Sequence, residues 1–203
     1  VGGTATYTIT PSAGSCNGTP VVVVVTVNPL PDADATDQTI CSGSTTSIAI
    51  TNPNGIAGTT FTWVVQSNPG AVTGAGSGSG ATIAQTLVNP TNTVQTVTYR
   101  ITPRSGAGCD GPTFDVDAVV NPTPNVLATP ASQTICSGSS TGITISNPNG
   151  VAGTTFSWTV VQSGVTGAAA GSGAAISQTL SSSVAGVGGT ATYTITPSAG
   201  SCN

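Results

Sequence analysis

The chain has 203 residues, of which only 4% are charged, and its formal net charge is −4. Its two arginines cannot neutralise a row of phosphates, which argues against a nucleic-acid partner. No apolar run reaches the ~18 residues of a membrane span, so no membrane insertion is expected of these residues. The chain has no histidine and no paired acid and base, and we therefore expect no enzyme activity.

The sequence is internally repeated. Residues 38–43 (Gln-Thr-Ile-Cys-Ser-Gly) return as residues 133–138, and residues 1–17 recur letter for letter as residues 187–203. Such self-similarity is typical of an array of one structural unit. We divide the chain into residues 1–30, the last two strands of a preceding repeat; residues 31–122, a complete repeat; and residues 123–203, a second repeat that lacks its final strand.

The first predicted element is a β-hairpin. Residues 4–10 alternate small polar and larger side chains, residues 11–18 carry turn residues, and residues 21–27 are almost all Val. Two such runs around a turn predict paired strands. The Asn-Pro-Leu-Pro of residues 28–31 then ends the pairing, because proline has no N–H to donate. Residues 121–124 (Asn-Pro-Thr-Pro) match this predicted linker.

The complete repeat is predicted to be all-β. An opening strand ends near Ile40, and further strands are expected at residues 47–51, 59–65, 83–88, 94–102 and 114–120. Residues 52–55 read as a turn and residues 74–80 as a flexible loop. About seven short strands at regular spacing, with a Trp on the third, predict a two-sheet sandwich of immunoglobulin-like type.

The aromatic residues of these strands share the alternation of their apolar neighbours. Because successive side chains of a strand point to opposite faces, this places them inside the sandwich. A structural role is therefore preferred over carbohydrate binding. The expected core aromatics are Phe61, Trp63, Tyr99, Phe156, Trp158 and Tyr193.

Several motifs carry a resemblance to a known family. They are Ile-Cys-Ser-Gly (135–138), Ala-Gly-Thr-Thr-Phe-Ser-Trp (152–158), Val-Thr-Gly-Ala (165–168) and Tyr-Thr-Ile-Thr-Pro (193–197), each with a counterpart in the first repeat. Over its whole length the chain resembles the PKD-like, immunoglobulin-like tandem repeats, here about 93 residues long, of giant secreted surface proteins of Bacteroidota. The resemblance implies an extracellular, cell-surface location, export by the type IX route, and service as stalk or filament in adhesins, gliding adhesins included.

The five cysteines follow the repeat. Cys41 and Cys136 lie early in their repeats, and Cys16, Cys109 and Cys202 lie late. Two cysteines per repeat in a chain that resembles exported proteins favour disulfides over metal sites or nucleophiles.

Topology bears on the pairing. A strand of ~8 residues is about 26 Å long, whereas bridged Cα atoms lie within about 7 Å. The turns that hold Cys41 and Cys109 are expected at opposite ends of one domain. We therefore prefer a Cys41–Cys202 bridge across the domain junction, with Cys41–Cys109 and Cys136–Cys202 bridges inside the repeats as the alternative.

Acidic residues give one weak metal candidate. Asp32, Asp34 and Asp37 lie beside the first linker, and carboxylate oxygens suit Ca²⁺. The matched residues 125–133 hold no acid, so a solvated acidic patch is preferred and no cofactor is expected.

A cross-strand ion pair is predicted on the last two strands of the complete repeat. Asp115 and Asp117 have the outward alternation, and so does Arg100 on the partner strand. Val22 and Val24 hold the same outward positions in the preceding repeat. Exposed valines on a terminal strand suggest packing against a neighbour or cover by their own domain.

These features together predict a structural role without catalysis: the stalk or filament shaft of a large secreted cell-surface adhesin. The expected partners are neighbouring repeats of the same chain and like chains in a filament. The alternative is an adhesive module whose loop at residues 66–79 binds a glycan or a host protein.

Overall fold

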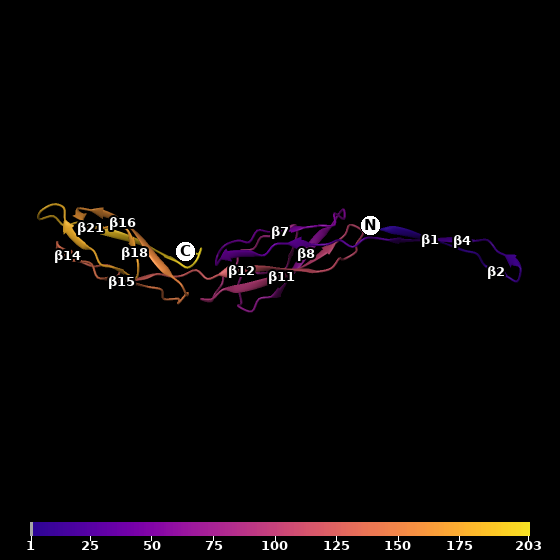
Figure 1. Cartoon of the computed structure of the whole chain (residues 1–203), viewed down its shortest axis with the longest axis horizontal. Helices are drawn as coiled ribbons and strands as arrows, with labels where there is room; N and C mark the ends of the chain where they lie inside the picture. The colour runs from indigo at the N-terminus through magenta and orange to yellow at the C-terminus, as the bar shows by residue number, and fades with distance from the viewer. Residues whose placement is uncertain (1) are drawn as a thin grey trace.

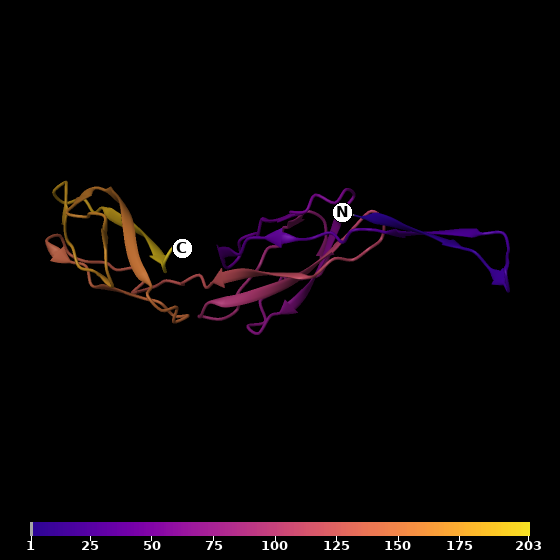
Figure 2. The same ribbon diagram turned by 45° about the vertical axis from the view of Figure 1, so that its right-hand side comes forward.

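The structure, a computed structural model, describes residues 2–203. Strands and their connections make up this part of the chain, and no helix in it is long and apolar enough to cross a membrane. Figures 1 and 2 show three parts in a row: an N-terminal hairpin, a complete repeat in the middle and a second repeat at the other end.

The N-terminal hairpin projects away from the rest of the molecule (Figure 1). Its strands β1 (Gly3–Ile9) and β4 (Val21–Val27) pair antiparallel, with Tyr7 opposite Val23. The short strands β2 (Ser12–Ala13) and β3 (Cys16–Asn17) form its tip. The hairpin expected from the sequence is thus confirmed, and all seven residues of β4 are exposed.

The complete repeat is a sandwich of two sheets. One sheet has the order β10-β7-β5, from β5 (Asp34–Ala35), β7 (Ile48–Thr51) and β10 (Thr82–Ile83). The other has the order β6-β12-β11-β8-β9, from β6 (Gln38–Cys41), β8 (Thr60–Ser67), β9 (Gly78–Ser79), β11 (Gln95–Arg104) and β12 (Phe114–Asn121). Strand β12 lies between β11, antiparallel to it, and β6, parallel to it.

The two sheets bury alternate residues of their strands against each other. Ile48 and Ile50 of β7 meet Phe61, Trp63 and Tyr99 of the larger sheet in one buried cluster. This alternation confirms the all-β sandwich predicted from the sequence, because a period of two puts every second side chain on the inner face.

The expected strand at residues 83–88 is wrong beyond Ile83. Only isolated bridges follow, among them Thr45 with Thr86. The reason is a side chain: the hydroxyl of buried Thr46 donates to the carbonyl of Ile83 at 2.8 Å and accepts from the amide of Gln85 at 2.9 Å. It replaces ladder bonds that a regular strand would make.

The expected flexible loop at residues 74–80 is wrong at Gly78 and Ser79, which form β9. Gly78 belongs to β9 and lies opposite Trp63 of β8. A Cβ on Gly78 would fall 2.5 Å from the Trp63 ring. Glycine is needed at this position so that the indole can lie against the backbone, and not for mobility.

The second repeat copies this plan with an open edge. Its first sheet holds β13 (Leu127–Thr129), β15 (Ile143–Ser146) and β19 (Ala175–Ile176). A second sheet has the order β14-β20-β17, from β14 (Ser139–Ser140), β17 (Val165–Thr166) and β20 (Thr179–Ser182). A third has the order β18-β16-β21, from β16 (Thr155–Ser163), β18 (Gly171–Ser172) and β21 (Thr190–Ser198). Strand β21 is the outer member of its sheet.

The aromatic residues of the second repeat are less covered than their counterparts. Trp158 is buried, but Phe156 and Tyr193 are half-buried and pack at the margin of the core. Tyr99, the counterpart of Tyr193, is 0% exposed. The difference arises because β11, which carries Tyr99, has β12 paired along its outer side. No strand in residues 2–203 pairs with the outer side of β21, which carries Tyr193.

The expected surface ion pair is confirmed. Both nitrogens Nε and Nη2 of Arg100 donate to the carboxylate of Asp115, with the closer contact at 2.7 Å. This hydrogen bond lowers the pKa of Asp115. Asp117 instead accepts a hydrogen bond from the hydroxyl of Thr98 at 2.7 Å.

Candidate functional site: the bridged domain junction

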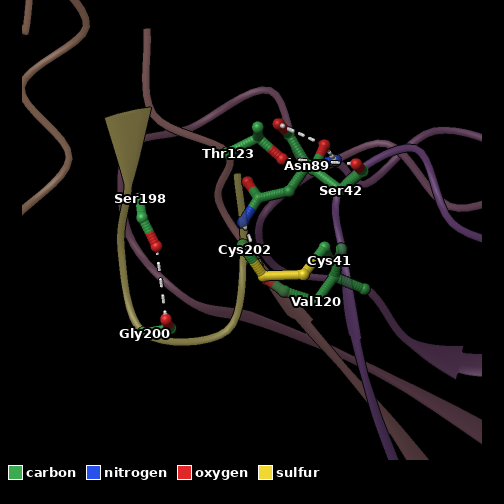
Figure 3. The surroundings of a disulfide bond; sticks show 8 residues. All are labelled: Cys41, Ser42, Asn89, Val120, Thr123, Ser198, Gly200 and Cys202. Carbon is green, nitrogen blue, oxygen red and sulfur yellow. Dashed lines mark hydrogen bonds between the residues drawn. A yellow bond between two sulfur atoms is a disulfide. The ribbon is translucent and has the colours of Figure 1, made fainter. Parts of the chain in front are cut away.

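A disulfide between Cys41 and Cys202 closes the junction between the two repeats (Figure 3). Their Cα atoms are 5.5 Å apart, although 161 positions separate them in the sequence. Cys41 is the last residue of β6 and lies beside Asn121 at the end of β12. Cys202 follows β21 and is fully buried. The structure thus holds the junction pair that the sequence argument preferred over bridges within a repeat.

Two tight turns present these cysteines. After Cys41, the amide of Ser44 donates to the Cys41 carbonyl at 3.0 Å, and Gly43 takes the positive φ of 87° that this turn requires. At the other side, Ala199 and Cys202 exchange backbone hydrogen bonds of 2.8 and 3.1 Å. Both sulfur atoms are therefore carried by backbone that is already fixed.

Asn89 ties the Cys41 turn to the end of β12. Its side-chain amide donates to the carbonyl of Val120 at 2.9 Å and to that of Thr93 at 2.7 Å, and its backbone amide donates to Oγ of Ser42 at 3.0 Å. Figure 3 shows Asn89, Ser42 and Val120 around the disulfide. Asn89 was not predicted from the sequence, because nothing in its own segment distinguishes it from other loop asparagines.

The linker between the repeats is clamped by the second repeat. Nδ2 of Asn149 donates to the carbonyl of Thr123 at 2.9 Å, and its Oδ1 accepts from the amide of Asn125 at 3.1 Å. The hydroxyl of Thr123 donates to the carbonyl of Ser42 at 3.3 Å. The linker is therefore bonded to both repeats.

The same clamp holds the first linker. Nδ2 of Asn54 donates to the carbonyl of Leu30 at 2.9 Å, as Asn149 does to Thr123. Asn54 and Asn149 occupy the same place in two Asn-Pro-Asn-Gly turns, which the sequence indicated only as turns. Their junction role could have been suspected from the matched linkers that accompany them.

The other three cysteines, Cys16, Cys109 and Cys136, form no disulfide within residues 2–203. Their turns nevertheless copy those of the bridged pair. The amide of Ser139 donates to the Cys136 carbonyl at 3.0 Å, as Ser44 does to Cys41. The amide of Ser105 donates to the Cys109 carbonyl at 2.9 Å, as Ala199 does to Cys202.

A family model described as the PKD-like domain matches residues 38–124 and 133–203. The chain belongs to the PKD-like domain family. Comparison with curated proteins returned no match. PKD-like domains of this immunoglobulin-like type are generally non-catalytic, and the family indicates a structural or adhesive extracellular module. The disulfide is compatible with an extracellular location.

In the first PKD-like repeat the weak metal candidates do not converge. Oδ1 of Asp32 accepts from the amide of Ala33 at 2.9 Å, and Oδ1 of Asp37 accepts from the amide of Asp117 at 2.9 Å. Asp34 is exposed on β5. No group of three metal-ligating side chains occurs among residues 2–203. The three carboxylates thus cap or face separate parts of the backbone.

Residues 66–79, the alternative ligand-binding loop, fold back onto their own PKD-like repeat. The side chain of Asn68 bonds both the amide of Val72, at 2.9 Å, and its carbonyl, at 2.8 Å. Val72 is buried in the core, and Gly78 pairs with β8. Asn68, Val72 and Gly78 are thus held within their own repeat.

A Tyr–Gln pair recurs inside both PKD-like repeats. The hydroxyl of Tyr99 donates to Oε1 of Gln85 at 2.7 Å, and Nε2 of Gln85 donates to the carbonyl of Gly76 at 2.7 Å. Burial raises the pKa of Tyr99 to about 12. Tyr193 and Gln178 form the same bond at 2.8 Å. This pair holds the core and has no arrangement suited to catalysis.

Proposed function

We propose that this chain is part of the stalk or filament shaft of a large secreted cell-surface adhesin, where its repeats hold a distal region away from the cell. The observation that carries the proposal is the Cys41–Cys202 bridge, which joins two repeats rather than closing one. Its neighbours in the array are further repeats of the same kind, and like chains are the expected partners in a filament.

Three features of the junction support a stiff spacer. The linker is short and holds two prolines, which fix its φ angles. The side chain of Asn149 bonds it to the second repeat. The disulfide then opposes bending and twisting between the repeats. A recognition module would not need any of these at its boundary with a neighbour.

Small-angle scattering of the 203-residue chain tests the stiffness. The oxidised chain should give one narrow distribution of lengths, that of an elongated rod. A reductant or the substitution Cys202→Ser should broaden this distribution, and Cys16→Ser, at the hairpin tip, should leave it unchanged. An oxidised chain as flexible as the reduced one would contradict the spacer function.

Immunogold electron microscopy of the source cells tests the location. An antibody raised against residues 31–203 should label intact cells along extended surface structures. Antibody first absorbed with the purified chain is the control. Labelling that appears only after the cells are broken would contradict a surface stalk.

A further inference from the structure

Each linker clamp is an asparagine followed by a glycine: Asn54–Gly55 at the first linker and Asn149–Gly150 at the second. The two glycines have φ angles of 66° and 67°, which L side chains rarely adopt, so both turns require glycine. Because the following residue has no side chain, its backbone nitrogen can approach the asparagine closely. An asparagine before glycine is therefore the one that deamidates most readily through a cyclic imide.

The reaction at Asn149 needs only water. The backbone nitrogen of Gly150 loses its proton and attacks Cγ of Asn149. The N–Cγ bond forms, the Cγ–Nδ2 bond breaks, and Nδ2 takes up that proton and leaves as ammonia. Water then opens the five-membered imide at either carbonyl, which gives aspartate or isoaspartate. The net change is the addition of one water and the loss of one ammonia, with no oxidation.

The same turns contain a second asparagine that cannot react in this way. Asn52 and Asn147 precede Pro53 and Pro148, and the nitrogen of proline has no hydrogen to lose. Nδ2 of Asn147 is also bonded within its own turn, to the carbonyl of Val151 at 2.9 Å. Each turn thus holds one reactive asparagine and one inert asparagine, which serves as an internal control.

In the folded chain the clamp opposes the reaction at Asn149. Its Nδ2 donates to the carbonyl of Thr123, and its Oδ1 accepts from the amide of Asn125. The amide of Gly150 is bonded as well, to the carbonyl of Asn147 at 3.2 Å. Attack requires the Asn149 side chain to leave the linker and the Gly150 amide to leave its acceptor. The rate therefore depends on how often the junction opens locally.

The clamp and the disulfide hold the same interface. Thr123, whose carbonyl accepts from Asn149, donates its hydroxyl to the carbonyl of Ser42 at 3.3 Å, and Ser42 follows Cys41 (Figure 3). Nδ2 of Asn92, in the first repeat, donates to the carbonyl of Gly150 at 3.4 Å. The two repeats therefore have to separate at this place before Asn149 can turn away from the linker.

The junction also gives water access to Asn149. A cavity of about 420 Å³ lies there, and its lining includes Ser42, Asn89, Asn92, Thr123 and Asn149. These side chains are all polar, so the cavity suits water. It can hold the water that opens the imide and receive the ammonia that leaves.

We propose that Asn149–Gly150 is a self-modifying site of the junction, whose deamidation is held back by the Cys41–Cys202 bridge and, once complete, removes the clamp on the linker. An aspartate at residue 149 has no hydrogen to donate to the carbonyl of Thr123, so two oxygen atoms face each other there. It also brings a charge into residues 123–203, which hold no Asp, Glu, Lys, Arg or His. A junction that has opened is thus marked irreversibly.

This inference goes beyond the spacer function, and the two can fail separately. Deamidation depends on the turn and on the clamp, whereas the spacer function depends on the stiffness of the unmodified chain. A chain that never deamidates would still give the scattering of a stiff rod.

The modification is tested by peptide mapping of the oxidised 203-residue chain after incubation at mildly alkaline pH in H₂¹⁸O. Digestion at acid pH keeps imide formation slow during the mapping. Asn149 and the exposed Asn54 should become mixtures of aspartate and isoaspartate that carry ¹⁸O, and Asn147 should stay unlabelled. Absence of the label at Asn149, or an equal label at Asn147, would overturn the proposal.

The role of the bridge is tested by the same mapping after reduction and alkylation. The rate at Asn149 should rise several-fold. The rate at Asn54 should not rise, because Asn54 bonds the carbonyl of Leu30 at the other linker. Cys202→Ser should give the same result without a reductant. An unchanged rate at Asn149, or an equal rise at both asparagines, would show that the bridge does not hold this clamp.

The consequence is tested with Asn149→Asp, a product of the reaction, and with Gln162→Glu as the control. Both variants replace an amide with a carboxylate, but Gln162 is exposed on β16. Coupling between the clamp and the bridge is reciprocal, so loss of the clamp should make the bridge easier to reduce.

A titration with reduced glutathione is the measurement. The Cys41–Cys202 bond should be reduced at a several-fold lower concentration in Asn149→Asp than in the original chain, and Gln162→Glu should match the original chain. Equal midpoints for the two variants would overturn the proposal.

Discussion

Cys41 and Cys202 belong to different repeats, yet their Cα atoms lie 5.5 Å apart. This proximity exists because β6 runs parallel to β12 and ends where β12 enters the linker, while the turn after β21 folds back to the same place. The position of the bridge follows from the topology of the sandwich and from the short linker together.

Loss of this bridge should lower the free energy of unfolding. The closed loop spans 161 positions, for which the chain-entropy model gives about 4 to 5 kcal/mol. Guanidinium unfolding of Cys202→Ser and of the reduced original chain should show the loss, and Cys16→Ser should not. Equal midpoints for the oxidised and the reduced chain would show that the bridge does not stabilise the fold.

Gln85→Ala should weaken the core of the first repeat. The substitution leaves the Tyr99 hydroxyl and both backbone groups of Gly76 without their partner, and we expect a loss of about 2 to 3 kcal/mol. The matched variant Gln178→Ala should lose less, because Tyr193 is half-buried and water can replace the amide. Urea unfolding of both variants is the measurement, and a larger loss for Gln178→Ala would contradict this account.

Gly78→Ala should destabilise the chain, whereas Gly76→Ala should be tolerated. The new Cβ at residue 78 would lie 2.5 Å from the Trp63 ring, but at residue 76 the nearest atom, on the Gln85 side chain, would be 3.9 Å away. Overpacking of this kind costs about 1 to 3 kcal/mol. Thermal unfolding compares the two variants, both in a Trp158→Phe background so that the fluorescence of Trp63 is a local probe. Equal melting temperatures would mean that the indole can move aside.

Stability should fall at alkaline pH through Tyr99. Its pKa in the folded state is about 12, above the ordinary value of 10.0, because burial disfavours the phenolate. The contribution is complete below pH 10 and is lost as the pH rises from 10 to about 12. Two pKa steps correspond to about 2 to 3 kcal/mol. The free thiols are first blocked by alkylation, and urea unfolding then measures the free energy of unfolding against pH. Tyr99→Phe should flatten the slope of this plot. An unchanged slope in Tyr99→Phe would assign the titration to another group.

The fold was predictable where it depends on local chemistry. Alternation placed Phe61, Trp63 and Tyr99 inside, and prolines marked the ends of β4 and β12. The Arg100–Asp115 pair followed from the same alternation on adjacent strands. Each of these signals lies within one segment or one pair of strands.

Side chains that bond to distant backbone could not be predicted in this way. Thr46 ends the strand at Ile83, Asn89 holds the end of β12, and Gln85 reaches Tyr99. Each partner lies in another segment, and the polar residue itself looks like any loop residue in the sequence. Gly78 was misread for the same reason, since only the packed Trp63 shows why a side chain is excluded there.

The bridge between residues 41 and 202 also sets the path of tension. When the two ends of the chain are pulled apart, the load passes from Cys41 through the sulfur atoms to Cys202, and residues 42–201 lie outside that path. While the bond is intact, these residues are shielded from stretching; they include the second sandwich and all strands of the first except β5 and β6. Reduction would release this stored length, so the redox state decides how far the molecule can extend before it breaks.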